Sequence, residues 1–157
     1  MKTVLKFSGV IACIFALIAF IMVLACNAVQ YELIGTHYVK GTTVLFGGDH
    51  IKLAPAALVA FILLIVALII VIAGIVLPLA KVTKLDKISG ILNLVAVVAL
   101  ILAGILIFCT KNSLCDANDA AKDYYDLTVG YVFAGIFSLI AGIFAVLPAV
   151  ANLISKK

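Results

Sequence analysis

Four long apolar segments alternate with short polar stretches along this chain. The segment from Leu5 to Ala25 contains one charged residue, Lys6, and the later segments contain none. A helix needs about 20 apolar residues to cross a hydrocarbon core of about 30 Å. The pattern therefore predicts an all-α membrane protein, with residues 1–157 forming a single four-helix transmembrane domain. The expected spans are residues 5–26, 55–80, 88–109 and 127–154.

The polar stretches between the spans differ in length and pattern. Residues 27–54 and 110–126 form the two longer loops, and residues 81–87 form a short basic turn. The first loop contains YELIGTHYVKGTTVLFGG, in which β-branched and aromatic residues are interrupted by glycines. Such a pattern is typical of strands bounded by turns. We therefore expect a short β-hairpin in the first loop.

The composition supports the same class of protein. The chain is 67% hydrophobic and 11% charged, and its mean hydropathy is +1.39. These values are not those of a water-soluble domain. The sequence also contains no arginine, the residue best suited to bidentate phosphate contacts. We therefore expect contact with membrane lipid and no nucleic-acid partner.

The distribution of charge predicts the orientation of the chain. One side would carry seven lysines against one acid, Asp86, whereas the other would carry four lysines against six acids. Short loops rich in lysine stay on the cytoplasmic side. We interpret the chain as a multi-pass protein of the plasma membrane, with cytoplasmic N- and C-termini and two extracellular loops. The seven lysines are Lys2, Lys6, Lys81, Lys84, Lys87, Lys156 and Lys157.

Short sequence signals recur in the two halves of the chain. KFSG (Lys6 to Gly9) precedes the first span and KISG (Lys87 to Gly90) precedes the third. The returning spans carry IAGIVLP, ending at Pro78, and IAGIFAVLP, ending at Pro148. We interpret this order as two tandem helical hairpins related by an axis along the membrane normal. Chance recurrence of common apolar residues is the alternative interpretation.

Small residues are spaced four apart on several of the predicted helices. Helices in lipid approach one another through such residues, because lipid provides no hydrophobic drive for their association. Span four also carries a second row, Ala141, Ala145 and Ala149, which suggests either a further internal contact or contact with another subunit. The expected packing residues are Ser8, Ala12, Ala16, Gly74, Ala134, Ser138 and Gly142.

Candidate chemistry within the spans is sparse. No Asp, Glu, Lys or His falls in the central part of any span, and Asn93 is the most polar deep residue. We interpret Asn93 as an interhelical hydrogen-bond partner rather than as the lining of a conduction path. His37 and His50 lie 13 residues apart without a neighbouring cysteine, which is weak metal spacing. The sequence predicts no catalytic, metal or cofactor site.

Three cysteines, Cys26, Cys109 and Cys115, map to the predicted extracellular side, where disulfides persist. Pairing of Cys109 with Cys115 closes the smallest loop and is the first expectation. A link from Cys26 to either partner is the rival. The N-terminal segment ending at Cys26 also looks like a bacterial lipoprotein signal, but its apolar centre is long and Leu24 is large. We therefore expect an uncut first helix.

The arrangement of four spans, with both ends inside and a longer first outer loop, is similar to that of claudin-like and connexin-like tetraspan proteins. The chain lacks the tryptophan and paired cysteines of the claudin first loop, and it also lacks the three cysteines per outer loop of connexins. The resemblance in layout implies loops that contact subunits or partners. The leading hypothesis is a non-enzymatic protein of membrane assembly or partner binding, as a homo-oligomer or with other membrane subunits. The alternatives are a subunit of an oligomeric pore and, third, a small transporter or membrane enzyme.

Overall fold

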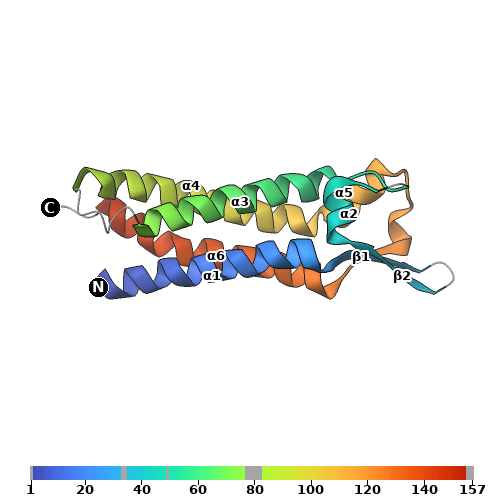
Figure 1. The fold of residues 1–157 in the computed structure, drawn as a ribbon, viewed down its shortest axis with the longest axis horizontal. Coiled ribbons are helices and arrows are strands. Elements are labelled where there is room, and N and C mark those ends of the chain that lie inside the picture. Colours follow the sequence, from blue (N-terminus) through green and yellow to red (C-terminus); the bar gives the residue numbers. More distant parts are fainter. Residues whose placement is uncertain (1, 33–34, 49, 77–82, 155–157) are drawn as a thin grey trace.

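The computed structural model describes residues 2–32, 35–48, 50–76 and 83–154. Within these ranges four long helices run side by side, and the start of the first helix lies at the same end of the bundle as the end of the last (Figure 1). Each helix is long and apolar enough to cross a membrane, which confirms the four predicted segments. The helices are α1 (Lys2–Ala25), α3 (Pro55–Val76), α4 (Thr83–Phe108) and α6 (Val129–Ile154).

The helix ends differ slightly from the predicted spans. Helix α3 ends at Val76, and residues 77–80 of the expected second span lie outside the described residues, as do residues 81 and 82 of the expected turn. Helix α6 starts at Val129 and continues beyond Pro148 to Ile154. A proline inside a helix removes one backbone hydrogen bond. The helix nevertheless continues here, with Pro148 in its last two turns.

Small residues line the inside of the bundle and large apolar residues cover its outside. Helix α6 packs against both α1 and α4, α3 packs mainly against α4, and the seam between α1 and α3 is the least extensive. Exposed side chains such as Ile69, Ile91 and Ile143 face outward, where a membrane would supply hydrocarbon. This distribution fits helices that associate through close backbone approach in lipid. The fully buried small residues are Ala12, Ala16, Ala19, Ala60, Ala67, Ala96, Ala103, Ala134, Ala141 and Ala149.

The other end of the bundle is covered by the two loop segments, which we call the cap (residues 26–54 and 109–128). The predicted hairpin is present as β1 (Asn27–Glu32) and β2 (Thr36–Lys40). A third strand, β3 (Tyr125–Leu127), comes from the second loop and completes an antiparallel sheet of order β2-β1-β3. The cap therefore joins segments about 100 residues apart in the sequence. Its remaining elements are α2 (Gly41–Phe46), α5 (Thr110–Ala117) and the short 3-10 helix η2 (Lys122–Tyr124).

The predicted disulfide is absent from the structure, in which all four cysteines are free thiols. Cys109 is exposed and immediately precedes α5, whereas Cys115 is buried within it. Six residues of helix separate two Cα atoms by about 9 Å along the axis, beyond the usual limit of about 7 Å for a disulfide. The expectation assumed an open turn between these residues. The chain folds into a helix there instead, and Cys26 pairs with neither cysteine.

Candidate functional site

Polar side chains buried within the helices hold the helices together. Three serine hydroxyls each donate a hydrogen bond to a backbone carbonyl of a neighbouring helix. Ser8 donates to Phe144 O at 2.5 Å, Ser89 to Gly74 O at 3.2 Å, and Ser138 to Leu100 O at 2.7 Å. These bonds join α1 to α6, α4 to α3, and α6 to α4. Hydroxyl groups in lipid need such partners, because no water is present to satisfy them.

The remaining predicted packing residues also lie inside the bundle. Ala12, Ala16 and Ala134 are fully buried. A Cβ added to Gly142 would lie 3.0 Å from Ile101 Cγ1 on α4, so this glycine allows α6 to approach α4 closely. A Cβ on Gly74 would overlap the amide of Asn93, at 2.8 Å from its Cγ.

Asn93 lies between α3 and α4 with only 4% of its surface exposed. Its side chain packs on Gly74. The interhelical hydrogen bond expected of Asn93 stays a prediction, and the nearby Ser89 joins the same two helices through its bond to Gly74 O. Neither Asn93 nor Ser138 reaches the outer surface of the bundle.

The cap is attached to the helix ends by backbone contacts. The amide of Gly41 donates to Cys26 O at 3.0 Å, which returns the hairpin to the end of α1. The amide of Thr128 donates to Ala28 O at 3.0 Å, and its hydroxyl bonds Asn27 O. Deeper in the bundle, the hydroxyl of the fully buried Tyr131 donates to Val23 O at 3.2 Å. The first strand is thereby fixed to both α1 and α6.

Side chains in α5 and directly after it connect the second loop to the first. The Asn118 carboxamide pairs with the backbone of Lys52, accepting from its amide at 2.7 Å and donating to its carbonyl at 3.1 Å. Ser113 Oγ accepts a hydrogen bond from the amide of Ala56 at 3.0 Å. Because Ala56 lies in the first turn of α3, this bond satisfies a backbone donor that has no partner within its own helix. The two loops therefore form one connected unit.

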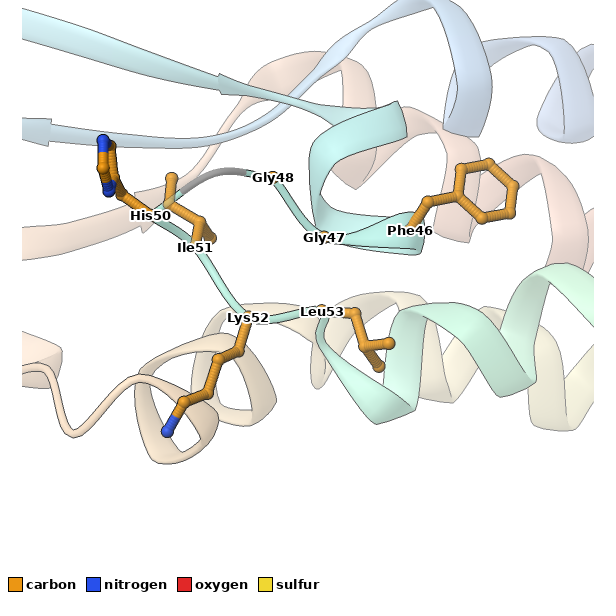
Figure 2. Close-up of a pocket in the computed structure, with 7 residues that line it drawn as sticks. All are labelled: Phe46, Gly47, Gly48, His50, Ile51, Lys52 and Leu53. Carbon is orange, nitrogen blue, oxygen red and sulfur yellow. The ribbon is translucent and has the colours of Figure 1, made fainter.

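A pocket of about 710 Å³ opens at the edge of the cap where the chain runs from α2 to α3 (Figure 2). His50 and Lys52 are the ionisable side chains on its described wall, and their ends point apart from each other in Figure 2. Phe46, Gly47, Gly48, Ile51 and Leu53 complete the lining. The described residues provide no group of three metal-ligating side chains here or elsewhere. The pocket thus lacks converging groups that would bind a charged ligand.

A second pocket, of about 530 Å³, lies between α5 and the start of α3. Its polar lining includes Cys109, Asn112 and Asp116. Asp116 forms a salt bridge with Lys122, with 2.7 Å between Asp116 Oδ1 and Lys122 Nζ, and both side chains are largely exposed. Exposed ion pairs of this kind contribute little to stability. No catalytic arrangement is evident among these residues.

An aromatic row crosses the sheet from edge to edge. Tyr31 on β1 lies between His37 on β2 and Tyr125 on β3, with ring centroids 5.2 Å and 5.3 Å apart. These residues are paired directly across the strands, so the contacts fix the register of all three. Burial raises the pKa of Tyr125 and that of the Cys115 thiol, because charge is disfavoured away from water. The row stiffens the sheet and leaves His37 at the exposed edge.

The sequence pointed to β1 and β2 through their β-branched and aromatic residues but missed β3, Asn118 and Ser113. No local pattern distinguishes these residues, because each acts through a partner far along the chain. No family model, curated protein or solved structure matches this chain. The candidate site therefore depends on the geometry of the cap alone.

Proposed function

We propose that this chain is a non-enzymatic tetraspan membrane protein that acts in assembly or partner binding. It would work as a homo-oligomer or as a subunit of a larger membrane complex. The observation that carries the proposal is the construction of the cap, in which both loops are joined into one preformed surface. Preformed surfaces bind partners at a smaller cost in conformational entropy than flexible loops do.

The location of the polar groups also supports this proposal. The serine hydroxyls in the helices are engaged in holding one helix to the next, and they leave no arrangement that suggests chemistry on a substrate. Among the side chains that the structure describes, exposed charged and imidazole groups lie in the cap, including His37, Lys40 and Asp126. Recognition of a partner would therefore take place at the cap.

The orientation proposed for the chain follows from its charges. In the sequence, lysines concentrate before and within the starts of α1 and α4 and after α6, whereas acids concentrate in the cap segments. The positive side of such proteins stays in the cytoplasm. We infer a plasma-membrane protein whose termini are cytoplasmic and whose cap is extracellular.

The pore alternative receives less support from the packing. In an oligomeric pore, weakly polar residues such as Asn93 and Ser138 would be the candidates to line a conduit between copies of the chain. Both are buried inside a single bundle, at 4% and 0% exposure. A conduit formed between bundles would instead be lined by large apolar side chains such as Ile91 and Ile143.

Chemical cross-linking and native mass spectrometry in mild detergent test the proposed function. The expected result is a defined oligomer or a complex with a co-purifying membrane protein. A chain that is strictly monomeric and free of other proteins under these conditions would contradict the proposal.

A further inference from the structure

The free edge of β2 is the part of the cap best suited to bind another strand. In the sheet order β2-β1-β3, one side of β2 has no neighbouring strand. Across the described part of the chain, its backbone pairs with β1 and no other segment. Thr36, His37 and Tyr38 are exposed, and Figure 1 shows the β1–β2 hairpin projecting beyond the helix ends. An exposed strand edge is a template for pairing with another strand.

The opposite edge of the sheet is less suited to this role. Strand β3 has only three residues, and it lies beside α5. Lys111 on α5 forms a salt bridge with Asp126 of β3 at 3.2 Å. Few backbone groups of β3 are therefore available for a ladder with another chain.

We propose that β2 pairs antiparallel with β2 of a second copy of this chain, which approaches head to head from a facing membrane. The inference rests on the proposed function, because it names the partner of the cap. A two-fold axis through the pair would place Tyr38 opposite the partner's Tyr38. The two sheets would then form one continuous sheet of six strands.

The charges on β1 and β2 are complementary in this antiparallel register. Thr36, Tyr38 and Lys40 alternate onto one face of β2, and Glu32 shares this face because it pairs with Thr36. With Tyr38 at the centre, the partner's Lys40 would lie opposite Thr36. About 10 Å, or two strand spacings, would then separate the Cα atoms of the partner's Lys40 and Glu32. Extended Lys and Glu side chains together span this distance over the small Thr36. Because the proposed pair is two-fold symmetric, the contact between Glu32 and the partner's Lys40 occurs twice.

The same charges disfavour pairing between copies that lie in one membrane. Such copies point in the same direction, so their β2 strands would run parallel along the projecting hairpin (Figure 1). A parallel pair in register would place Lys40 beside the partner's Lys40. Like charges at neighbouring positions destabilise strand pairing. The head-to-head arrangement removes this repulsion and supplies an opposite charge in its place.

The central contact of the proposed pair is aromatic. The side chain of Tyr38 is 56% exposed although it belongs to a regular strand. Cross-strand aromatic pairs contribute to strand association beyond the ladder of backbone hydrogen bonds. In the head-to-head pair, the two Tyr38 rings would cover each other on the face that also carries Lys40.

Liposome bridging by charge-swapped variants tests the proposal. We expect vesicles that carry the intact protein to aggregate through their caps, measured by light scattering. Lys40→Glu or Glu32→Lys alone should slow aggregation about tenfold, because two attractive contacts become repulsive. The double variant should recover the rate to within about twofold. Thr42→Glu, an exposed change outside the strand, is the matched control and should leave the rate unchanged.

Cysteine cross-linking tests whether Tyr38 lies at the centre of the contact between the two copies. In a Cys109→Ser background, Tyr38→Cys should form a disulfide between two differently tagged vesicle populations, whereas Thr42→Cys should not. Absence of bridging by the intact protein overturns the inference, and so does aggregation that the single charge changes leave unaltered. If the protein still cross-links within one membrane in that case, the proposed function stands and only the head-to-head pairing is wrong. A monomer in both measurements contradicts both proposals.

Discussion

Replacing Gly41 by alanine should detach the hairpin from the end of α1. Gly41 is the first residue of α2, and its amide donates to Cys26 O at 3.0 Å. A Cβ at this position would overlap the carbonyl oxygen of Val23 and lie 2.9 Å from that of Cys26. Both obstacles are backbone atoms at the end of α1, so no side-chain rotation relieves them.

The expected loss in the free energy of unfolding follows from these contacts. Inserting a methyl group into a closely packed site costs about 1–3 kcal/mol, and backbone obstacles place this site at the upper end. Weakening the Gly41 to Cys26 hydrogen bond adds about 1 kcal/mol. The higher helix propensity of alanine returns up to about 1 kcal/mol. The expected net loss is about 3 kcal/mol, which lowers the melting temperature of a domain of this size by about 6–12 °C.

In a Cys109→Ser background, thermal unfolding in detergent measures this loss through the reaction of a thiol-specific fluorophore with Cys115, which is buried in the cap. Gly48→Ala is the matched control in the same loop. A Cβ there would meet only Thr43 Cγ2, at 3.0 Å, and that side chain can move. The reasoning fails if Gly41→Ala melts within about 2 °C of the unmodified protein, or if both variants lose the same stability.

Three further outcomes are expected. Asn118→Ala should raise the hydrogen-exchange rate of the Lys52 amide at least about tenfold, measured by mass spectrometry, because the pairing of these residues is lost. At neutral pH an impermeant maleimide should label the exposed Cys109 of intact cells at least about tenfold faster than the buried Cys115, and non-reducing peptide mapping should find no link between them. Burial raises the pKa of Cys115 above the usual 9.0, so its contribution to stability is present below pH 9.0 and disappears as the pH rises through the folded value. Thermal melts above pH 9.0 should therefore show falling stability, and Cys115→Ala should flatten this part of the curve.

Hydrophobic length and charge were enough to predict the helices of this protein. Each apolar segment has about the length that a bilayer requires, so the four helices and their approximate ends follow from the lengths of these segments. The first two strands also carry a local signal, since Tyr31, Tyr38 and Val39 are residues that strands favour.

The parts that escaped prediction depend on contacts distant in sequence. Strand β3 has three residues and includes Asp126, which strands disfavour, so only its pairing with β1 makes it a strand. The disulfide prediction used loop length as its guide, whereas the helical path of α5 decides the separation of Cys109 and Cys115. The sequence around Asn118 is typical of a turn. Its pairing with Lys52 could not be predicted, because it forms only when the fold brings the two loops together.

Two hydrogen bonds between helices bear on the proposed duplication. Ser8 of α1 donates to Phe144 O of α6, and Ser89 of α4 donates to Gly74 O of α3. Both serines belong to the KFSG and KISG signals, and both acceptors precede a proline by four residues, Pro148 and Pro78 in the sequence. A two-fold relation between the halves would exchange these two hydrogen bonds.

The cap breaks this correspondence. The first loop supplies two strands and α2, whereas the second supplies α5 and one short strand. A change in the loops leaves the serine hydrogen bonds between the helices intact. The β1–β2 hairpin has no counterpart in the second half, and it is the segment whose edge is open to a partner.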